Sequence, residues 1–262
     1  MPAMTDDTPS VTRFGQADLQ IHTAHGDGMA DARALLDHVE QYTDLDVLAV
    51  TDHDDVEGAL RAQELHAQGN YRFEFVPGIE LTTRSGHLLA LWIDEPLPSL
   101  RPLEESVAAV HRAGGLAVVP HPFSWLTRSI GQRALERVLA SEDPAVHPDG
   151  IEVANPTLAG RVTGAKASRL NAERYGLAET GGSDAHFLEH VGSATTQFEG
   201  TTAADLRRAI EQRRCSGVTH GAPGLRTLGV RRLAEQQVRG LAVTPRKVVG
   251  ERWRRLREVA RR

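Results

Sequence analysis

Histidine and acidic side chains follow short apolar runs at several points of this chain. His53 comes shortly after the run 47–50, and His121 comes shortly after the run 116–119. Imidazole nitrogens and carboxylate oxygens bind divalent transition metals of borderline softness. Cys215 is the only cysteine, so any metal must be held by nitrogen and oxygen ligands and no internal disulfide can form. The pattern therefore predicts a metal site built from His, Asp and Glu.

Seven motifs share this make-up, and each alone is a weak signal. They are Asp18-Leu-Gln-Ile-His22 with Asp27-Gly28, Thr51-Asp52-His53, Gly78-Ile-Glu80, Gly86-His87, Pro120-His121-Pro122, Glu152, and Gly181-Gly-Ser-Asp184-Ala-His186. A single histidine beside a strand is more often a hydrogen-bonded structural residue than a ligand. If all these groups meet at one place, however, burying them without a metal would be costly. A metal cluster resolves that cost.

Apolar runs alternate with helical patterns along the chain, which is typical of βα units around a parallel sheet. The expected strands are 17–23, 47–50, 73–76, 87–93, 116–119, 150–153 and 177–179. The expected helices are 30–42, 56–68, 106–113, 135–140, 163–175 and 202–212. This pattern predicts a closed or nearly closed β/α barrel, with the site at the C-terminal ends of its strands. Alternate residues of a strand face the same side, so Gln20 and His22 should both face the interior.

The chain divides into an expected barrel domain, 1–221, and a basic, helical tail, 222–262. The tail holds twelve Lys or Arg and three Glu, although the whole chain has a net charge of −5. One interpretation is a tail packed on an acidic body through its apolar side chains, which are Leu228, Val230, Leu233, Val238, Leu241 and Val243. The other is a contact surface for nucleic acid. Trp253 is its only aromatic residue, which weakens the second interpretation.

No segment of the sequence has the pattern of a membrane anchor or a secretion signal. Residues 1–10 are polar and lack an apolar core. No run approaches 18 consecutive apolar residues. We therefore expect a soluble, cytoplasmic protein without membrane partners. The sequence does not indicate an oligomeric state.

The ordered motifs resemble those of the polymerase-and-histidinol-phosphatase (PHP) family of metal-dependent phosphoesterases. The resemblance covers about residues 14–221 and leaves out the basic tail. It implies a distorted (β/α)7 barrel that holds up to three metal ions, with Mn, Fe and Zn as the candidates. Family members often carry a helical insertion before the His-Pro motif. The segment between His87 and His121 is too short for one, which predicts a more open cleft.

The resemblance also implies which side chains hold each metal. One ion would take His22, Glu80 and Asp184; a second would share Glu80 and add His87 and His121; a third would take Asp27, His53 and His186. Asp52 and Glu152 would support these ligands or face the substrate. The family usually has His-x-His in the first motif, and here the first His is Gln20. Gln20 is therefore either a weaker ligand or a group that holds water or substrate.

These features favour metal-activated water as the nucleophile for hydrolysis of a nucleotide, sugar phosphate or short oligonucleotide. No protein nucleophile is expected. Arg128 is the candidate phosphate-binding residue, with Arg84 and Arg161 as weaker candidates. Two alternatives stay open. One is a metal-dependent hydrolase of a non-phosphate substrate such as an amide, and the other is a non-catalytic metal-binding regulatory module.

Overall fold

A computed structural model describes residues 13–221 and 228–241 of the chain. Its nine strands form one sheet in the order β7-β6-β5-β4-β3-β2-β1-β8-β9. The strands are β1 (Phe14–Asp18), β2 (Val47–Val50), β3 (Glu74–Thr82), β4 (His87–Leu91), β5 (Leu116–Val119), β6 (Gly150–Ala154), β7 (Ala178–Gly181), β8 (Ala194–Glu199) and β9 (Cys215–Thr219). The sheet curls until its two edge strands, β7 and β9, contact each other, and the backbone N–H of Gly181 in β7 donates to Thr196 Oγ1 in β8. The expected distorted α/β barrel is confirmed.

The sheet is not parallel throughout, as simple βα alternation would require. β1, β2 and β3 run parallel, and so do β5, β6 and β7. β4 is antiparallel to both of its neighbours, and β8 and β9 are antiparallel to the strands beside them. The sequence analysis predicted seven strands and missed β8 and β9. These two strands close the barrel beside β1.

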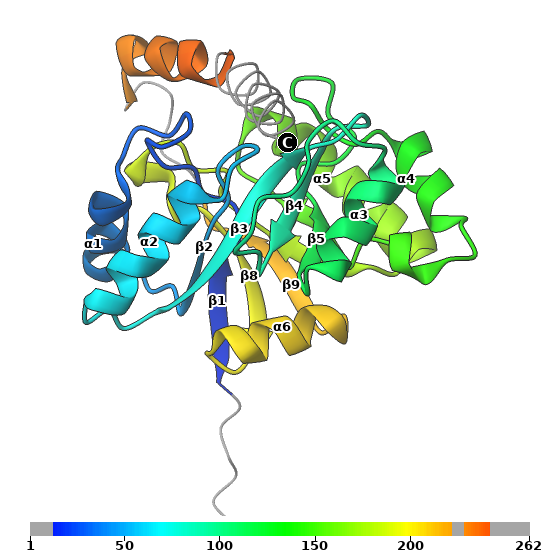
Figure 1. The fold of residues 1–262 in the computed structure, drawn as a ribbon, viewed down its shortest axis with the longest axis horizontal. Coiled ribbons are helices and arrows are strands. Elements are labelled where there is room, and N and C mark those ends of the chain that lie inside the picture. Colours follow the sequence, from blue (N-terminus) through cyan, green and yellow to red (C-terminus); the bar gives the residue numbers. More distant parts are fainter. Residues whose placement is uncertain (1–12, 222–227, 242–262) are drawn as a thin grey trace, which may run out of the picture.

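Helices cover the outside of the barrel (Figure 1). They are α1 (Ala32–Tyr42), α2 (Glu57–Gln68), α3 (Leu103–Arg112), α4 (Gln132–Leu139), α5 (Leu158–Leu170) and α6 (Ala203–Glu211), with short helical turns η1 (Pro144–Val146), η2 (Asn171–Tyr175) and η3 (Leu188–His190). Side-chain hydrogen bonds fix the N-terminal ends of two of these helices. Asp31 accepts a hydrogen bond from the Ala34 N–H at the start of α1, and Thr202 with Asp205 forms a capping box at α6.

Apolar side chains fill the space on both faces of the sheet. On β2, Leu48 and Val50 belong to the core beneath the surrounding helices, whereas Val47 and Ala49 belong to the core inside the barrel. Leu206 of α6 joins the inner core. α6 therefore closes one end of the barrel with apolar side chains, at the bottom of Figure 1. The polar motifs gather at the other end.

The first strand is earlier and shorter than the predicted 17–23. It ends at Asp18, whose carboxylate accepts hydrogen bonds from the backbone N–H groups of Ser183 and Gly192, both at 2.9 Å. After β1 the chain makes one further bridge, from Ile21 to Ala185. Gln20 and His22 are nevertheless buried, as expected, with 0% and 3% of their surface exposed.

Residues 230–241 of the basic tail are helical and lie across the open end of the barrel, in orange at the top of Figure 1. Leu228 is buried, but Val230, Val238 and Leu241 are exposed. The prediction that these last three pack on the barrel is therefore wrong, because they lie on the outer side of the helix. Val243 and Trp253, with most of the basic residues of the tail, lie outside the described residues, so contact with nucleic acid stays a prediction.

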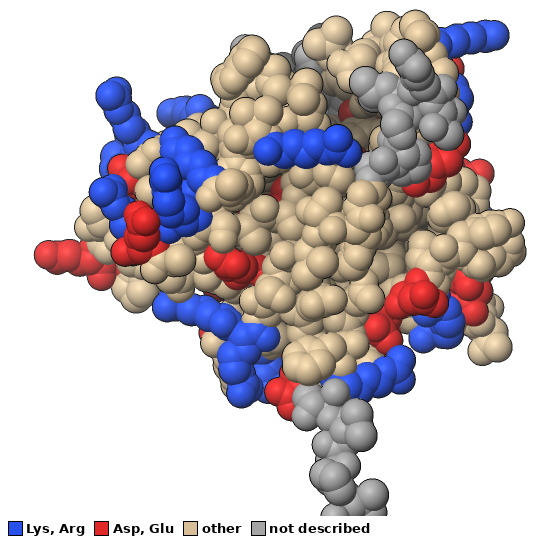
Figure 2. All heavy atoms as spheres, turned by 180° about the vertical axis from the view of Figure 1, so that it is seen from behind, with Lys and Arg blue, Asp and Glu red and all other residues tan. Residues whose placement is uncertain are grey.

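The face opposite to that drawn in Figure 1 is mixed in charge. Figure 2 shows Lys and Arg interspersed with Asp and Glu around an area without charged side chains. The expected negative charge of the body is therefore not concentrated on this face. Among the described residues, no helix has the length and apolar character that crossing a bilayer requires. The cytoplasmic location stays a prediction.

Candidate metal centre

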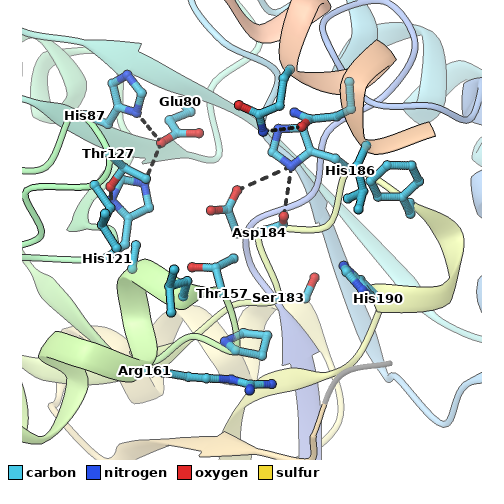
Figure 3. A pocket seen from close by; sticks show the side chains of 18 of the residues that line it. Glu80, His87, His121, Thr127, Thr157, Arg161, Ser183, Asp184, His186 and His190 are labelled. Atoms are coloured by element: carbon cyan, nitrogen blue, oxygen red, sulfur yellow. Dashed lines mark hydrogen bonds and ion pairs between the residues drawn. The ribbon is translucent and has the colours of Figure 1, made fainter. Parts of the chain in front are cut away.

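Glu80 lies at the centre of the polar end of the barrel. It sits inside β3, which is longer than the predicted 73–76 and forms a hairpin with β4. One carboxylate oxygen, Oε1, is 2.8 Å from His87 Nδ1 and 3.1 Å from His121 Nε2. The other, Oε2, is 3.1 Å from His22 Nε2 and 3.5 Å from His53 Nδ1. One buried carboxylate thus faces four imidazoles (Figure 3 shows two of them).

A second set of contacts continues from His22 toward Asp27 and Asp184. Asp184 Oδ1 is 3.3 Å from His22 Nε2, and Asp27 Oδ1 is 3.7 Å from His22 Nδ1. His186 Nε2 is 3.2 Å from Asp27 Oδ2, and His53 Nε2 is 3.9 Å from the same oxygen. The structure thus brings all eight residues that the sequence singled out as metal ligands into one cluster. That they bind metal stays our proposal.

Three overlapping groups in this cluster have the donor spacing of metal sites. Within each group, the candidate ligand atoms lie within 4.8 Å of one another. The groups are His22 with Glu80 and Asp184, His53 with Glu80 and His87, and His22 with Asp27, His53 and His186. The first matches one of the three sets implied by the family resemblance, and the other two largely overlap the remaining sets.

Hydrogen bonds orient two imidazoles so that the Nε2 atom of each faces a carboxylate. Ser129 Oγ donates to the His121 carbonyl at 2.7 Å, so at 3.0 Å it accepts from His121 Nδ1–H. His121 Nε2 then faces Glu80 Oε1. Likewise, His186 Nδ1–H donates to the Asp184 carbonyl, which leaves Nε2 facing Asp27. A proton or a metal cation must lie between each of these nitrogens and its carboxylate, and histidines oriented in this way are typical metal ligands. The residues therefore fit divalent metal ions.

The electrostatics of the cluster also favour a bound cation. Burial alone would lower the pKa of His121, but its hydrogen bond with Glu80 and the nearby acids raise that pKa to about 9. Burial would raise the pKa of Glu80, but the charges of His53 and His87 hold it well below the usual value. The carboxylates therefore stabilise positive charge among the imidazoles, which is the electrostatic environment that a metal cation requires.

Two buried acids support the cluster from outside. Asp52 accepts hydrogen bonds from the backbone N–H of Thr23 at 2.7 Å and from its hydroxyl at 2.6 Å, which fixes the loop after His22. Glu152 accepts from the backbone N–H of His121 at 2.7 Å and from Asn155. Burial raises the pKa of Glu152 to about 8. Both acids hold backbone that carries candidate ligands.

The backbone is strained at two of these positions. His121 has φ of 29° and Asp184 has φ of 53°, both in the left-handed region that non-glycine residues rarely occupy. Such strain persists where surrounding contacts enforce it, and it concentrates at functional sites. Here the hydrogen bonds to Glu152 and Ser129 hold His121 in place.

A cleft of about 550 Å³ opens beside the cluster. Its lining includes Arg161, which lies at the edge near Thr157 and Ser183 (Figure 3). Arg128 is exposed and is not among the lining residues. Its role as a phosphate-binding residue stays a prediction, and Arg161 is better placed. Gln20 is completely buried, and its side-chain amide has no hydrogen-bond partner among the described residues.

Several residues of this site were not predicted from the sequence. Ser129 orients His121, but it lies in a loop without any regular pattern and gave no signal. Leu233 and Gln236 of the tail line the cleft, although no residue of the tail was assigned to the site from the sequence. No local pattern in the tail points to the cleft, because the contact depends on how the chain returns over the barrel.

Comparisons with known proteins agree with this geometry. Residues 166–215 match the family model described as PHP-associated. An uncharacterized protein of Methanocaldococcus jannaschii is 30% identical over 149 residues, which are 52% of this chain and 85% of that protein. The chain belongs to the PHP family. The family and the clusters of His, Asp and Glu residues together support the binding of divalent metal.

Solved structures share the PHP fold at low sequence identity. A two-domain protein from Bacteroides vulgatus, which contains a predicted PHP-like metal-dependent phosphoesterase, superimposes with a TM-score of 0.63 and 18% identity. The match covers 80% of this chain and 66% of that one, so this chain spans about two thirds of the Bacteroides protein. An amidohydrolase from Chromobacterium violaceum, solved with bound sulfate, has a TM-score of 0.55 and 20% identity, over 78% and 98% of the two chains.

Proposed function

We propose that this PHP protein hydrolyses phosphate esters of small molecules with metal-activated water. The observation that carries the proposal is the position of Glu80, which divides its two oxygens between two pairs of imidazoles. A carboxylate shared in this way suits two metal ions side by side. When bound, such ions supply a deprotonated water at neutral pH and positive charge for the phosphoryl oxygens.

The donor set suits manganese, iron or zinc, in two or three sites. His22, Glu80 and Asp184 would hold one ion, His87 and His121 with Glu80 a second, and Asp27, His53 and His186 a third. Ser129 keeps the proton of His121 on Nδ1, so that Nε2 stays available as a ligand. The backbone hydrogen bond to Glu152 keeps the His121 loop in its strained conformation. Ser129 and Glu152 thus orient His121 for binding a metal ion.

Two related structures favour a reaction at phosphorus, and one keeps a second candidate open. The Bacteroides protein contains a predicted PHP-like metal-dependent phosphoesterase, and the Chromobacterium protein was solved with bound sulfate, an ion of the same shape as phosphate. The latter protein is nevertheless named an amidohydrolase. Hydrolysis of an amide by the same activated water is therefore the second candidate. A regulatory role without catalysis would require that the complete ligand cluster serve binding alone.

Metal content and a substrate panel test the proposal together. We expect protein reconstituted with manganese to retain at least one equivalent of metal and to cleave phosphomonoesters or phosphodiesters. A chelator should abolish the activity, and added manganese should restore it. Cleavage of amides alone would support the second candidate. Less than one equivalent of metal after reconstitution would overturn the metal-dependent mechanism itself.

Replacing Arg161 with alanine should raise KM for a phosphate ester about tenfold and change kcat little. Arg161 lines the cleft, and the hydrogen bonding of an arginine to a charged phosphate is worth about 1.5–3 kcal/mol in total. Because Arg161 is exposed, the smaller end of that range applies. Steady-state kinetics would measure the change.

Arg128→Ala is the matched control for this prediction. It removes the same side chain from a position outside the lining of the cleft. We expect it to leave KM unchanged. A rise in KM for Arg128→Ala but not for Arg161→Ala would show that Arg128, the candidate chosen from the sequence, binds the phosphate.

A further inference from the structure

The tail helix 230–241 forms one wall of the metal cleft. Leu233, Gln236 and Gln237 line the cleft together with residues of the barrel. Gln236 is buried, and its Nε2 lies 3.5 Å from Oδ2 of Asp27, one of the proposed metal ligands. The short segment between His87 and His121 predicted an open cleft. The helix from the C-terminal tail covers part of that cleft.

Specific contacts hold the helix in this position. Arg232 makes a two-pronged ion pair with Glu189, with N–O distances of 2.7 and 3.2 Å, and its guanidinium lies 5.0 Å from the centre of the Phe187 ring. Arg239 donates to the Gly28 carbonyl at 3.3 Å. Paired planar contacts of this kind fix an orientation as well as a position.

A glycine lets helix 230–241 lie close to the loop that carries Asp27. A Cβ atom at Gly240 would lie 3.0 Å from Asp27 Oδ2, closer than ordinary van der Waals contact. Glycine at this position therefore permits the helix to rest against the loop that carries a proposed ligand. The outer side chains, Val230 and Val238, make no comparable approach, since 84% and 68% of their surfaces are exposed.

The walls of the cleft away from the metal cluster are mainly apolar. Leu126, Pro156 and Leu158 come from loops and α5 of the barrel, Phe187 from the loop after β7, and Leu233 from the tail helix. The volume of about 550 Å³ is that of a pocket for one small organic molecule. An apolar pocket beside a polar centre suits a ligand with an anionic end and an apolar or flat organic part.

We propose that helix 230–241 is the roof of the substrate pocket and that Leu233 determines its specificity. The pocket takes phosphorylated small molecules with an apolar or aromatic organic part, and the roof excludes long nucleic-acid strands. This inference rests on the proposed phosphoesterase function, whose substrate class it narrows. Leu233 contacts the organic part, while Gln236 positions the Asp27 carboxylate.

Binding of phenylphosphonate, a phosphate-ester analogue that is not hydrolysed, tests the apolar contact independently of catalysis. We expect Leu233→Asn in the full-length, manganese-loaded protein to weaken binding about tenfold by calorimetry, since the polar side chain no longer offers apolar surface to the phenyl ring. In kinetics, the preference for phenyl phosphate over glycerol phosphate should fall by a similar factor. Val238→Asn makes a comparable change on the outer side of the same helix and should alter neither quantity.

The ion pair that holds the roof provides a second test. Arg232→Glu should raise the rate on a 5′-phosphorylated oligothymidylate relative to phenyl phosphate, because the helix no longer closes the cleft. Adding Glu189→Arg to Arg232→Glu restores an opposite-charge pair and should reverse the effect. Arg231→Glu is the matched control, since it makes the same charge change at the neighbouring exposed position.

The outcomes separate this inference from the proposed function. Equal binding of phenylphosphonate by the wild type and Leu233→Asn would contradict the proposal that helix 230–241 lines the substrate pocket, whether or not phosphate esters are cleaved. An unchanged oligonucleotide preference in Arg232→Glu would do the same. If Leu233→Asn weakens binding but no phosphate ester is hydrolysed, the roof stands and the proposed phosphoesterase function fails.

Discussion

Changing Glu80 to glutamine is expected to lower kcat/KM for phosphate esters at least about 100-fold and to reduce the bound metal. Loss of a group that merely supports a ligand typically costs 10–100-fold, and Glu80 is proposed as a ligand shared by two ions. Glutamine keeps the shape of the side chain and removes its charge. The mutual repulsion of two cations would then lose its main compensation. Metal analysis and steady-state kinetics on the same preparation would measure both effects.

Glu95→Gln is a suitable control, because Glu95 is exposed and lies outside the cleft lining. It should retain wild-type metal content and activity. Full metal content and full activity in Glu80→Gln would show that Glu80 is not shared between metals. Loss of activity with unchanged metal content would instead place Glu80 in contact with the substrate or the attacking water.

The site was more predictable from the sequence than the strands that carry it. The ligand motifs are short and local, so His53, His121 and Asp184 could be singled out by residue type and by their position after apolar runs. Their convergence followed from the barrel, because the ends of its parallel strands share one edge. The structure brings these residues together although several strand limits and directions differ from the prediction.

The errors concern features that depend on long-range contacts. β8 and β9 were missed because Thr195-Thr196-Gln197 and Cys215-Ser216-Gly217 are too polar to give a buried-strand pattern. β8 is held by pairing with β1, which lies far away in the sequence. The hairpin of β3 with β4 reverses direction where βα alternation predicts a crossover. Pairing partners of this kind are not encoded in a local window of residues.

Gln20 occupies the position where the family usually has the first His of His-x-His. Gln20 is completely buried and lies two residues before His22. It packs tightly against Gly182, where an added Cβ atom would lie 3.0 Å from the Cβ of Gln20. Neither atom of its amide has a hydrogen-bond partner among the described residues. A buried amide normally has partners, and leaving it without them costs about 1–3 kcal/mol. A bound ion, water or substrate oxygen would supply the missing partner.

Replacing Gln20 with histidine distinguishes these possibilities. If Gln20 is a weak ligand, the imidazole should raise metal affinity about tenfold or more, measured by competition with a chelator. If the amide holds a substrate oxygen, metal affinity should stay the same and turnover should fall, because the imidazole offers a different donor geometry. Gln68→His, at the exposed end of α2, controls for the added histidine. No change in either quantity would mean that the side chain at position 20 does not face the metal cluster, which would contradict the interior orientation expected for Gln20 and His22 together.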